Sequence, residues 1–193
     1  MLDQHLIASI SPLADPVNIV LWKDYRVTVL QDRLFRIEKS RNKKFRDKAT
    51  QMVWFRNMPP QEFTVTETQE RLEIGTPYCS LLLYEKREDC CIVINREEKA
   101  IGNEGNLLGT YRTLDGCNGN VFCGMDGIAK YTVTLENGVC SQSGIAVIDD
   151  AQSLSLGADG KVLPEKGEGS DEYVFAYGKD YRAAVRALYL ITG

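Results

Sequence analysis

Short apolar or alternating runs, separated by polar turns, dominate the first half of the chain. Residues 26–30 and 34–38 both alternate between apolar and polar side chains, and residues 31–33 between them fit a hairpin turn. Further strand candidates lie at residues 18–22, 50–55, 63–67, 71–75, 80–84 and 91–95. Strands that recur at this spacing, with no helical period between them, predict an all-β sandwich or barrel.

The second half is richer in loops and ends in a different period. Strands are predicted at residues 128–135, 145–148, 153–156 and 172–177, and glycine, asparagine and aspartate are dense from residue 105 to 150. Apolar side chains then follow a helical spacing at Tyr181, Ala184, Val185, Leu188 and Ile191. This spacing predicts a short amphipathic helix from about residue 180, with an apolar stripe that needs a packing partner.

Length and composition are those of one globular domain. The chain has 193 residues, 44% of them hydrophobic, which is enough to bury a core without disulfide bonds. The formal net charge of −4 argues against nucleic acid or an anionic membrane as a partner. Two basic runs, residues 23–26 and 41–48, are broken by acidic or apolar residues, and we interpret both as solvated loops.

The terminus and the cysteines favour a cytoplasmic protein. Residues 1–10 lack the apolar core of a secretion signal, and no run reaches the ~20 apolar residues of a membrane helix. The six cysteines, in a chain of this size without such a signal, are expected to be reduced thiols that pack as small hydrophobic residues.

Metal and nucleophilic chemistry have little support in the sequence. His5 is the one histidine and lies near the N-terminus, which disfavours a zinc site and a serine–histidine–aspartate triad. Residues 115–119 are rich in aspartate, asparagine and glycine, as calcium loops are, but no glutamate closes the loop at the right distance. We therefore expect no bound metal.

Asp149 and Asp150 are the most suggestive carboxylate pair for a glycosidase, which needs two carboxyl groups across one sugar. Consecutive residues of a strand point to opposite faces, so this pair cannot serve one substrate without a bulge. We expect the two side chains to cap backbone amides at the end of a strand.

Five segments occur in the same order as in a known family. They are residues 25–38, 45–51, 105–116, 135–150 and 177–189, and the third contains the motif Gly109-Thr-Tyr-Arg-Thr-Leu-Asp115. Together they resemble the N-terminal β-sandwich of glycoside hydrolase family 31, the α-glucosidase group, over about residues 17–193. One departure is Ile145, where the family often has a tryptophan that stacks against a sugar or a barrel loop.

The resemblance implies a fold for this chain and places catalysis on a separate domain. Residues 1–177 would form a galactose-mutarotase-like β-sandwich, and residues 178–193 a connecting helix that leads to a catalytic (β/α)8 barrel absent from this chain. The parent activity would be retaining hydrolysis or transfer at α-glycosidic bonds, without metal or organic cofactor. This chain has neither of the family's catalytic aspartate motifs, and its end falls about where the barrel would begin.

The resemblance also implies a place where this domain meets the substrate. A loop of the family's sandwich reaches the barrel mouth and can contribute an aspartate that binds sugar hydroxyl groups. Asp115 is the candidate for that role here, with Arg112 beside it, and a plain turn role for Asp115 is the alternative.

Three functional hypotheses follow. The leading one is a non-catalytic domain that packs on the barrel, partly through Tyr181, Val185 and Leu188, and helps to shape the pocket for an α-glucoside oligosaccharide. The second is a stand-alone carbohydrate-binding β-sandwich module that uses Trp22, Trp54, Tyr111 or Tyr131, although strand aromatics more often pack in cores. The third, a mutarotase or epimerase, needs a histidine and a carboxylate as an acid–base pair, and the single histidine argues against it.

Overall fold

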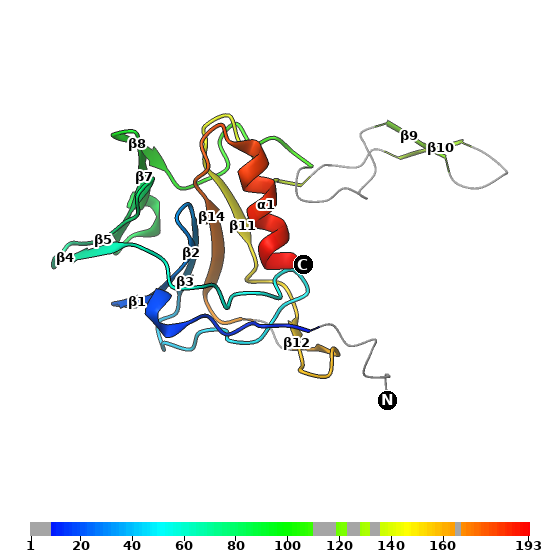
Figure 1. Ribbon diagram of the computed structural model, residues 1–193. Coiled ribbons are helices and arrows are strands. Elements are labelled where there is room, and N and C mark those ends of the chain that lie inside the picture. Colours follow the sequence, from blue (N-terminus) through cyan, green and yellow to red (C-terminus); the bar gives the residue numbers. More distant parts are fainter. Residues whose placement is uncertain (1–8, 110–118, 123–127, 132–135, 165–166) are drawn as a thin grey trace.

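The computed structural model describes residues 9–109, 119–122, 128–131, 136–164 and 167–193, and Figure 1 shows its layers. Two five-stranded antiparallel sheets make up most of this part of the chain, so the predicted all-β fold is confirmed. The central sheet contains, in spatial order, β1 (Ile19–Trp22), β2 (Tyr25–Gln31), β3 (Leu34–Lys39), β14 (Ser170–Phe175) and β11 (Ala146–Asp149). The outer sheet contains β4 (Thr64–Glu67), β5 (Arg71–Gly75), β6 (Cys79–Tyr84), β7 (Cys91–Ile94) and β8 (Glu97–Ala100).

Smaller elements connect and flank the two sheets. Two-stranded ribbons pair β9 (Gly119–Phe122) with β10 (Ile128–Tyr131) and β12 (Ser155–Leu156) with β13 (Val162–Leu163). Single 3₁₀ turns, η2 (Pro16–Asn18) and η3 (Arg87–Asp89), precede β1 and β7, and the chain ends in helix α1 (Tyr181–Thr192). Among the described helices, none combines the length and the apolar character needed to cross a membrane.

The first hydrophobic core lies between the two sheets. Alternate residues of β2 and β3, such as Val27, Val29 and Phe35, point toward the outer sheet and are fully buried. They pack with Leu72, Ile74, Leu81, Leu83 and Ile92 from the outer sheet. The alternation that predicted the hairpin therefore marks which face of each strand enters this core.

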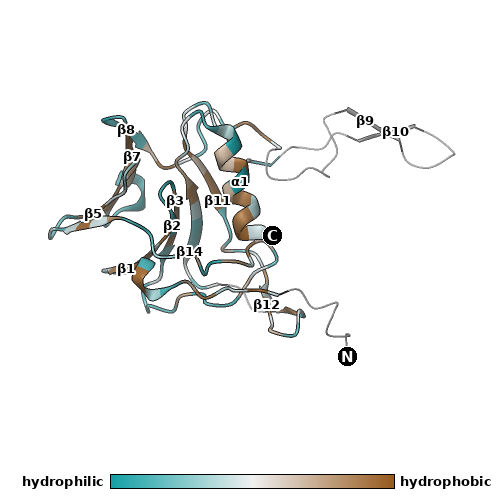
Figure 2. Cartoon of the chain, in the orientation of Figure 1, coloured by the Kyte–Doolittle hydropathy of each residue, from teal (hydrophilic) through white to brown (hydrophobic). Residues whose placement is uncertain are grey.

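The second core lies on the opposite face of the central sheet, under α1. Leu30, Leu34 and Phe175 of the sheet pack there with Leu188 and Ile191 of the helix. Figure 2 shows hydrophobic residues on α1 and on the strands beside it. The central sheet is thus covered on both faces, and the molecule has three layers: outer sheet, central sheet and helix.

The ends of α1 agree with the sequence pattern. Asp180 is the N-cap, and its Oδ1 accepts a hydrogen bond of 3.1 Å from Ala183 N. The expected stripe packs on this chain's own sheet: Leu188 is buried, and Tyr181 and Val185 are half-buried against the second core. The stripe therefore has a partner within the chain, whereas Tyr189 and Leu190 are exposed on the outer side.

The structure differs from the predicted elements at several places. Residues 50–55 form no strand and make only isolated bridges, Thr50 with Ser155 and Phe55 with Ser11, because this segment crosses the edge of the second core as an irregular loop. Strand β8 was not predicted, because its sequence Glu-Glu-Lys-Ala has no apolar alternation. Of the predicted strand 128–135, residues 128–131 form β10 and the remainder lies outside the described residues.

Candidate functional site: a buried arginine–carboxylate network

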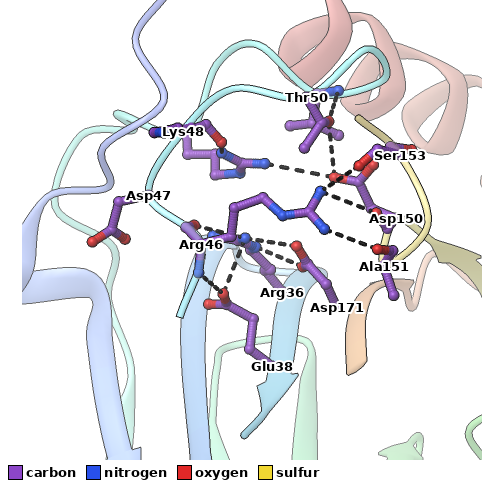
Figure 3. Close-up of polar contacts among 12 residues, drawn as sticks. Arg36, Glu38, Arg46, Asp47, Lys48, Thr50, Asp150, Ala151, Ser153 and Asp171 are labelled. Atoms are coloured by element: carbon purple, nitrogen blue, oxygen red, sulfur yellow. Dashed lines mark hydrogen bonds and ion pairs between the residues drawn. The ribbon is translucent and has the colours of Figure 1, made fainter. Parts of the chain in front are cut away.

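A cluster of ion pairs occupies the polar half of the central-sheet face that also carries the second core (Figure 3). We call it the arginine network; its members are Arg26, Arg36, Arg46 and Arg56 with Glu38, Asp47, Asp150 and Asp171. The strand register sets Arg26 opposite Glu38 across β2 and β3, and Glu38 opposite Asp171 across β3 and β14. Alternation directs these side chains away from the core between the sheets.

Arg36 forms the central contact of the network. Its Nε and Nη2 donate to Oδ1 and Oδ2 of Asp171 at 2.8 and 2.7 Å, a bidentate pair, although only 2% of the arginine is exposed. Nη2 also donates to the carbonyl oxygen of Arg46 at 2.9 Å and lies 3.1 Å from Glu38 Oε1. Burial lowers the pKa of Arg36, but Tyr173, Asp171 and Glu38 outweigh it and hold the pKa well above its usual value.

Arg26 and Glu38 form the second bidentate pair. Nε and Nη2 of Arg26 donate to the carboxylate of Glu38 at 2.6 and 3.0 Å, and Nη1 donates to Asp47 at 2.6 Å. The backbone N–H of Arg46 donates to Glu38 Oε1 at 3.0 Å. Glu38, 3% exposed, therefore joins two strands to the segment that follows them.

Arg46 fixes the turn after β11. Its guanidinium donates to the carbonyl oxygens of Asp150, Ala151 and Ser153 at 3.2, 2.9 and 3.1 Å, and Figure 3 shows it reaching across to this turn. Gly167 lies against the same guanidinium, where a Cβ would collide with Nη2 and would force the Arg46 side chain to shift. A residue at position 46 thus organises a turn about a hundred residues away.

Asp150 is the most deeply buried acid of the network, with no exposed surface. Its Oδ2 accepts a hydrogen bond of 2.9 Å from Thr50 Oγ1 and lies 3.6 Å from Nη2 of Arg56. The Nε of the same arginine donates to Tyr173 Oη at 2.6 Å. Burial and the negative charge of Asp171 raise the pKa of Asp150. For Asp171, burial acts in the same direction, but the charge and hydrogen bonds of Arg36 dominate and lower its pKa.

The predicted behaviour of Asp149 and Asp150 is confirmed for one residue. Asp149 is exposed, and its Oδ1 accepts a hydrogen bond of 2.9 Å from Ala151 N, the capping role expected from the sequence. Asp150 points to the opposite face, as expected, but it binds Thr50 and Arg56 side chains in the interior. The two carboxylates do not address one site.

The interpretation of the basic runs as solvated loops is wrong for two residues. Arg26 lies in β2 and Arg46 against the turn after β11, each 9% exposed. The missed signal is the alternation in Arg26-Val-Thr-Val and Phe35-Arg-Ile-Glu38, in which the polar positions share one face. Glu38 follows the same alternation and lies on the face of the arginines, and such a carboxylate can pair with a buried arginine.

The other predicted site residues are only partly described. Asp115, Arg112, Tyr111 and His5 lie outside the described residues, and Tyr131 lies in β10 with its side chain not described. Trp22, 3% exposed, belongs to the core between the sheets, while Trp54 is half-buried. Ile145 is fully buried in that same core.

Three of the described cysteines, Cys79, Cys90 and Cys91, are free thiols. Burial raises the pKa of Cys79 to about 11, so its thiol stays protonated near neutral pH. Cys117 and Cys123 lie outside the described residues. Within the described part of the chain, histidine, cysteine and acidic residues do not gather in threes as a metal site requires.

The arrangement is suited to holding segments together and offers no paired acid and base. Each buried carboxylate of the network is already bound by a guanidinium or a hydroxyl group. No protein-family model matches this chain, and no curated protein matches it in sequence.

Proposed function

We propose that this chain is the non-catalytic N-terminal β-sandwich of an α-glucosidase-like glycoside hydrolase. The observation that carries the proposal is the convergence of three family-like segments in the arginine network. Residues 25–38 supply Arg26, Arg36 and Glu38, residues 45–51 supply Arg46 and Thr50, and residues 135–150 supply Asp150. Segments that resemble a family in order, and that meet in a fold-determining cluster, are what a shared fold would require.

The contacts of the buried carboxylates support a structural role for this domain. A retaining glycosidase uses two carboxyl groups roughly 5 Å apart on either side of the scissile bond, one of them with a raised pKa. Glu38 and Asp171 are held in bidentate pairs with arginines, and Asp150 is held by Thr50. The reacting groups of the parent enzyme would therefore come from its barrel.

The domain would act by packing on that barrel and by shaping its pocket. Asp115, with Arg112 beside it, would reach the barrel mouth and bind hydroxyl groups of an α-glucoside oligosaccharide. Free thiols at Cys79, Cys90 and Cys91 support a reducing compartment, the cytoplasm, as the site of action.

The test compares this chain with the longer product of its reading frame. We expect the reading frame to encode a (β/α)8 barrel after residue 193, the longer product to hydrolyse p-nitrophenyl α-glucoside, and this chain alone to give no turnover. In the longer product, Asp115→Asn should raise KM by about tenfold or more, because a lost hydrogen bond to a charged acceptor weakens sugar binding. Clear turnover by a clean preparation of this chain alone would overturn the proposal, as would a reading frame that encodes no barrel.

A further inference from the structure

A cavity of about 500 Å³ opens beside the arginine network, between the central sheet and the segment that precedes β1. Arg26, Thr28 and Arg36 form its polar side on β2 and β3, and the chain from Pro12 to Pro16 forms the opposite wall. The volume falls within the range of sites for small molecules. The remaining contacts of these residues determine what such a molecule would need.

One buried polar group on the cavity wall lacks a partner within the described residues, and a neighbouring arginine has a donor that its hydrogen bonds there do not use. Thr28 is 1% exposed, and its Oγ1 makes no hydrogen bond there. Arg36 sits directly opposite Thr28 in the strand register, and its hydrogen bonds use Nε and Nη2, which leaves Nη1 as a free donor. Buried polar groups are nearly always paired, so the hydroxyl of Thr28, beside a cavity and next to an unused donor of Arg36, points to a ligand that supplies a partner.

The charges around the cavity select against ions. Arg26 is already paired with Glu38 and Asp47, Arg36 is paired with Asp171, and Asp15 adds a carboxylate at the rim. The two arginines and two aspartates of the lining balance, so the cavity has no net positive charge to attract an anion. A cation is disfavoured by the guanidinium, because all of its hydrogen-bonding groups are donors.

A neutral molecule with several hydroxyl groups satisfies all of these groups at once. One hydroxyl oxygen accepts from Arg36 Nη1 and pairs with Thr28, while another hydroxyl donates to the carboxylate of Asp47, half of which is exposed. Leu13, which lies on the opposite wall, supplies apolar surface for the C–H face of such a molecule. Sugars combine these two kinds of surface.

We propose that this cavity binds a neutral polyhydroxylated small molecule of monosaccharide size, with Thr28, Arg36 and Asp47 as its polar contacts. The proposal is independent of the glycosidase assignment, because it concerns a site made by this chain alone. The barrel pocket proposed above would involve Asp115 instead, in a different segment of the chain.

The experiment titrates the chain with glucose, sorbitol and gluconate, followed by calorimetry and ligand-observed NMR. We expect saturable millimolar binding of glucose or sorbitol and at least fivefold weaker binding of gluconate, which is similar in size but anionic. Thr28→Val, which keeps the shape and removes the hydroxyl, should weaken glucose binding at least fivefold. Thr66→Val, the same change at an exposed position of β4, should leave it unaltered.

A second variant covers the case in which Thr28→Val disturbs folding. Asp47→Asn removes a negative charge at the exposed rim, and it should raise the affinity for gluconate relative to glucose by about threefold or more. No saturable binding of glucose or sorbitol by the wild-type chain would overturn the proposal. Equal binding by a folded Thr28→Val variant would overturn it too, as would an Asp47→Asn variant with an unchanged preference between glucose and gluconate.

Discussion

Arg36 joins β3 to β14 and to the chain segment at Arg46, so its replacement removes one half of a buried ion pair. In the Arg36→Met variant, the carboxylate of Asp171 stays in the interior without the guanidinium that pairs with it. We expect the free energy of unfolding to fall by about 3–5 kcal/mol, as in other buried pairs that lose one partner. Urea denaturation measures the change.

The matched control is Arg71→Met, which breaks the surface pair between Arg71 and Glu73 on β5. Exposed pairs of this kind contribute little, so this variant should unfold at the wild-type urea concentration. If both variants unfold at the same midpoint, the arginine network does not stabilise the fold in the way proposed.

Asp150 and Asp171 should give opposite dependences of stability on pH. The folded pKa of Asp171 lies below its unfolded value near 4, so its contribution is present above that value and is lost as the pH falls through the folded pKa. The folded pKa of Asp150 is raised, so its contribution is present below the unfolded value and is lost as the pH rises through the folded pKa.

The two isosteric variants test these signs between about pH 3 and pH 7. Relative to the wild-type chain, Asp171→Asn should become less stable as the pH rises from acid. Asp150→Asn should instead become relatively more stable over the same range. Urea unfolding at several pH values provides the comparison, and slopes of the same sign for both variants would contradict the assignment.

Two leucine substitutions in helix α1 test which surface its apolar stripe packs against. Leu188 is 6% exposed and packs on the central sheet, whereas Leu190 on the same helix is 42% exposed. We expect Leu188→Ala to cost about 2–5 kcal/mol and Leu190→Ala less than about 1 kcal/mol, measured by thermal or urea unfolding. Similar small losses in both variants would mean that the stripe has its real partner outside this chain.

Elements governed by local pattern were predictable from the sequence, and those governed by distant contacts were not. The hairpin of β2 and β3 follows from alternation within a few residues, and α1 follows from its period and from Asp180 as N-cap. Residues 50–55 look like a strand because they are apolar and β-branched, but Thr50 is fixed by Asp150 and the backbone of Trp54 donates to Ile191. Such partners are a hundred or more residues away and leave no local signal.

The candidate site shows the same limit. The pairing of Arg26 with Glu38 was within reach of a strand alignment, since both lie on adjacent strands of one hairpin. The bonds from Arg46 to the turn at Asp150 join segments with no local relation, and only the fold brings them together. The cavity beside Arg36 also depends on the path of the residues before β1.

For the whole molecule, the central sheet is the element that both cores share. Trp22 reports on the core between the sheets, and Trp54 lies beside the end of α1, where its backbone N–H donates to Ile191 O at 2.9 Å. When either layer detaches, the central sheet exposes the apolar face that this layer covered and loses that part of its stabilisation. We therefore expect the outer sheet, central sheet and helix to unfold together.

The chain has two tryptophans, so Trp54→Phe leaves Trp22 as the only indole and Trp22→Phe leaves Trp54. In each variant, the fluorescence transition in urea should coincide with the transition in far-ultraviolet circular dichroism of the same protein, as two-state unfolding requires. Comparing two probes within one variant removes the effect of the substitution on stability. If Trp54 fluorescence changes at a lower urea concentration than the circular dichroism, the helical layer detaches first, and the central sheet does not couple the two cores.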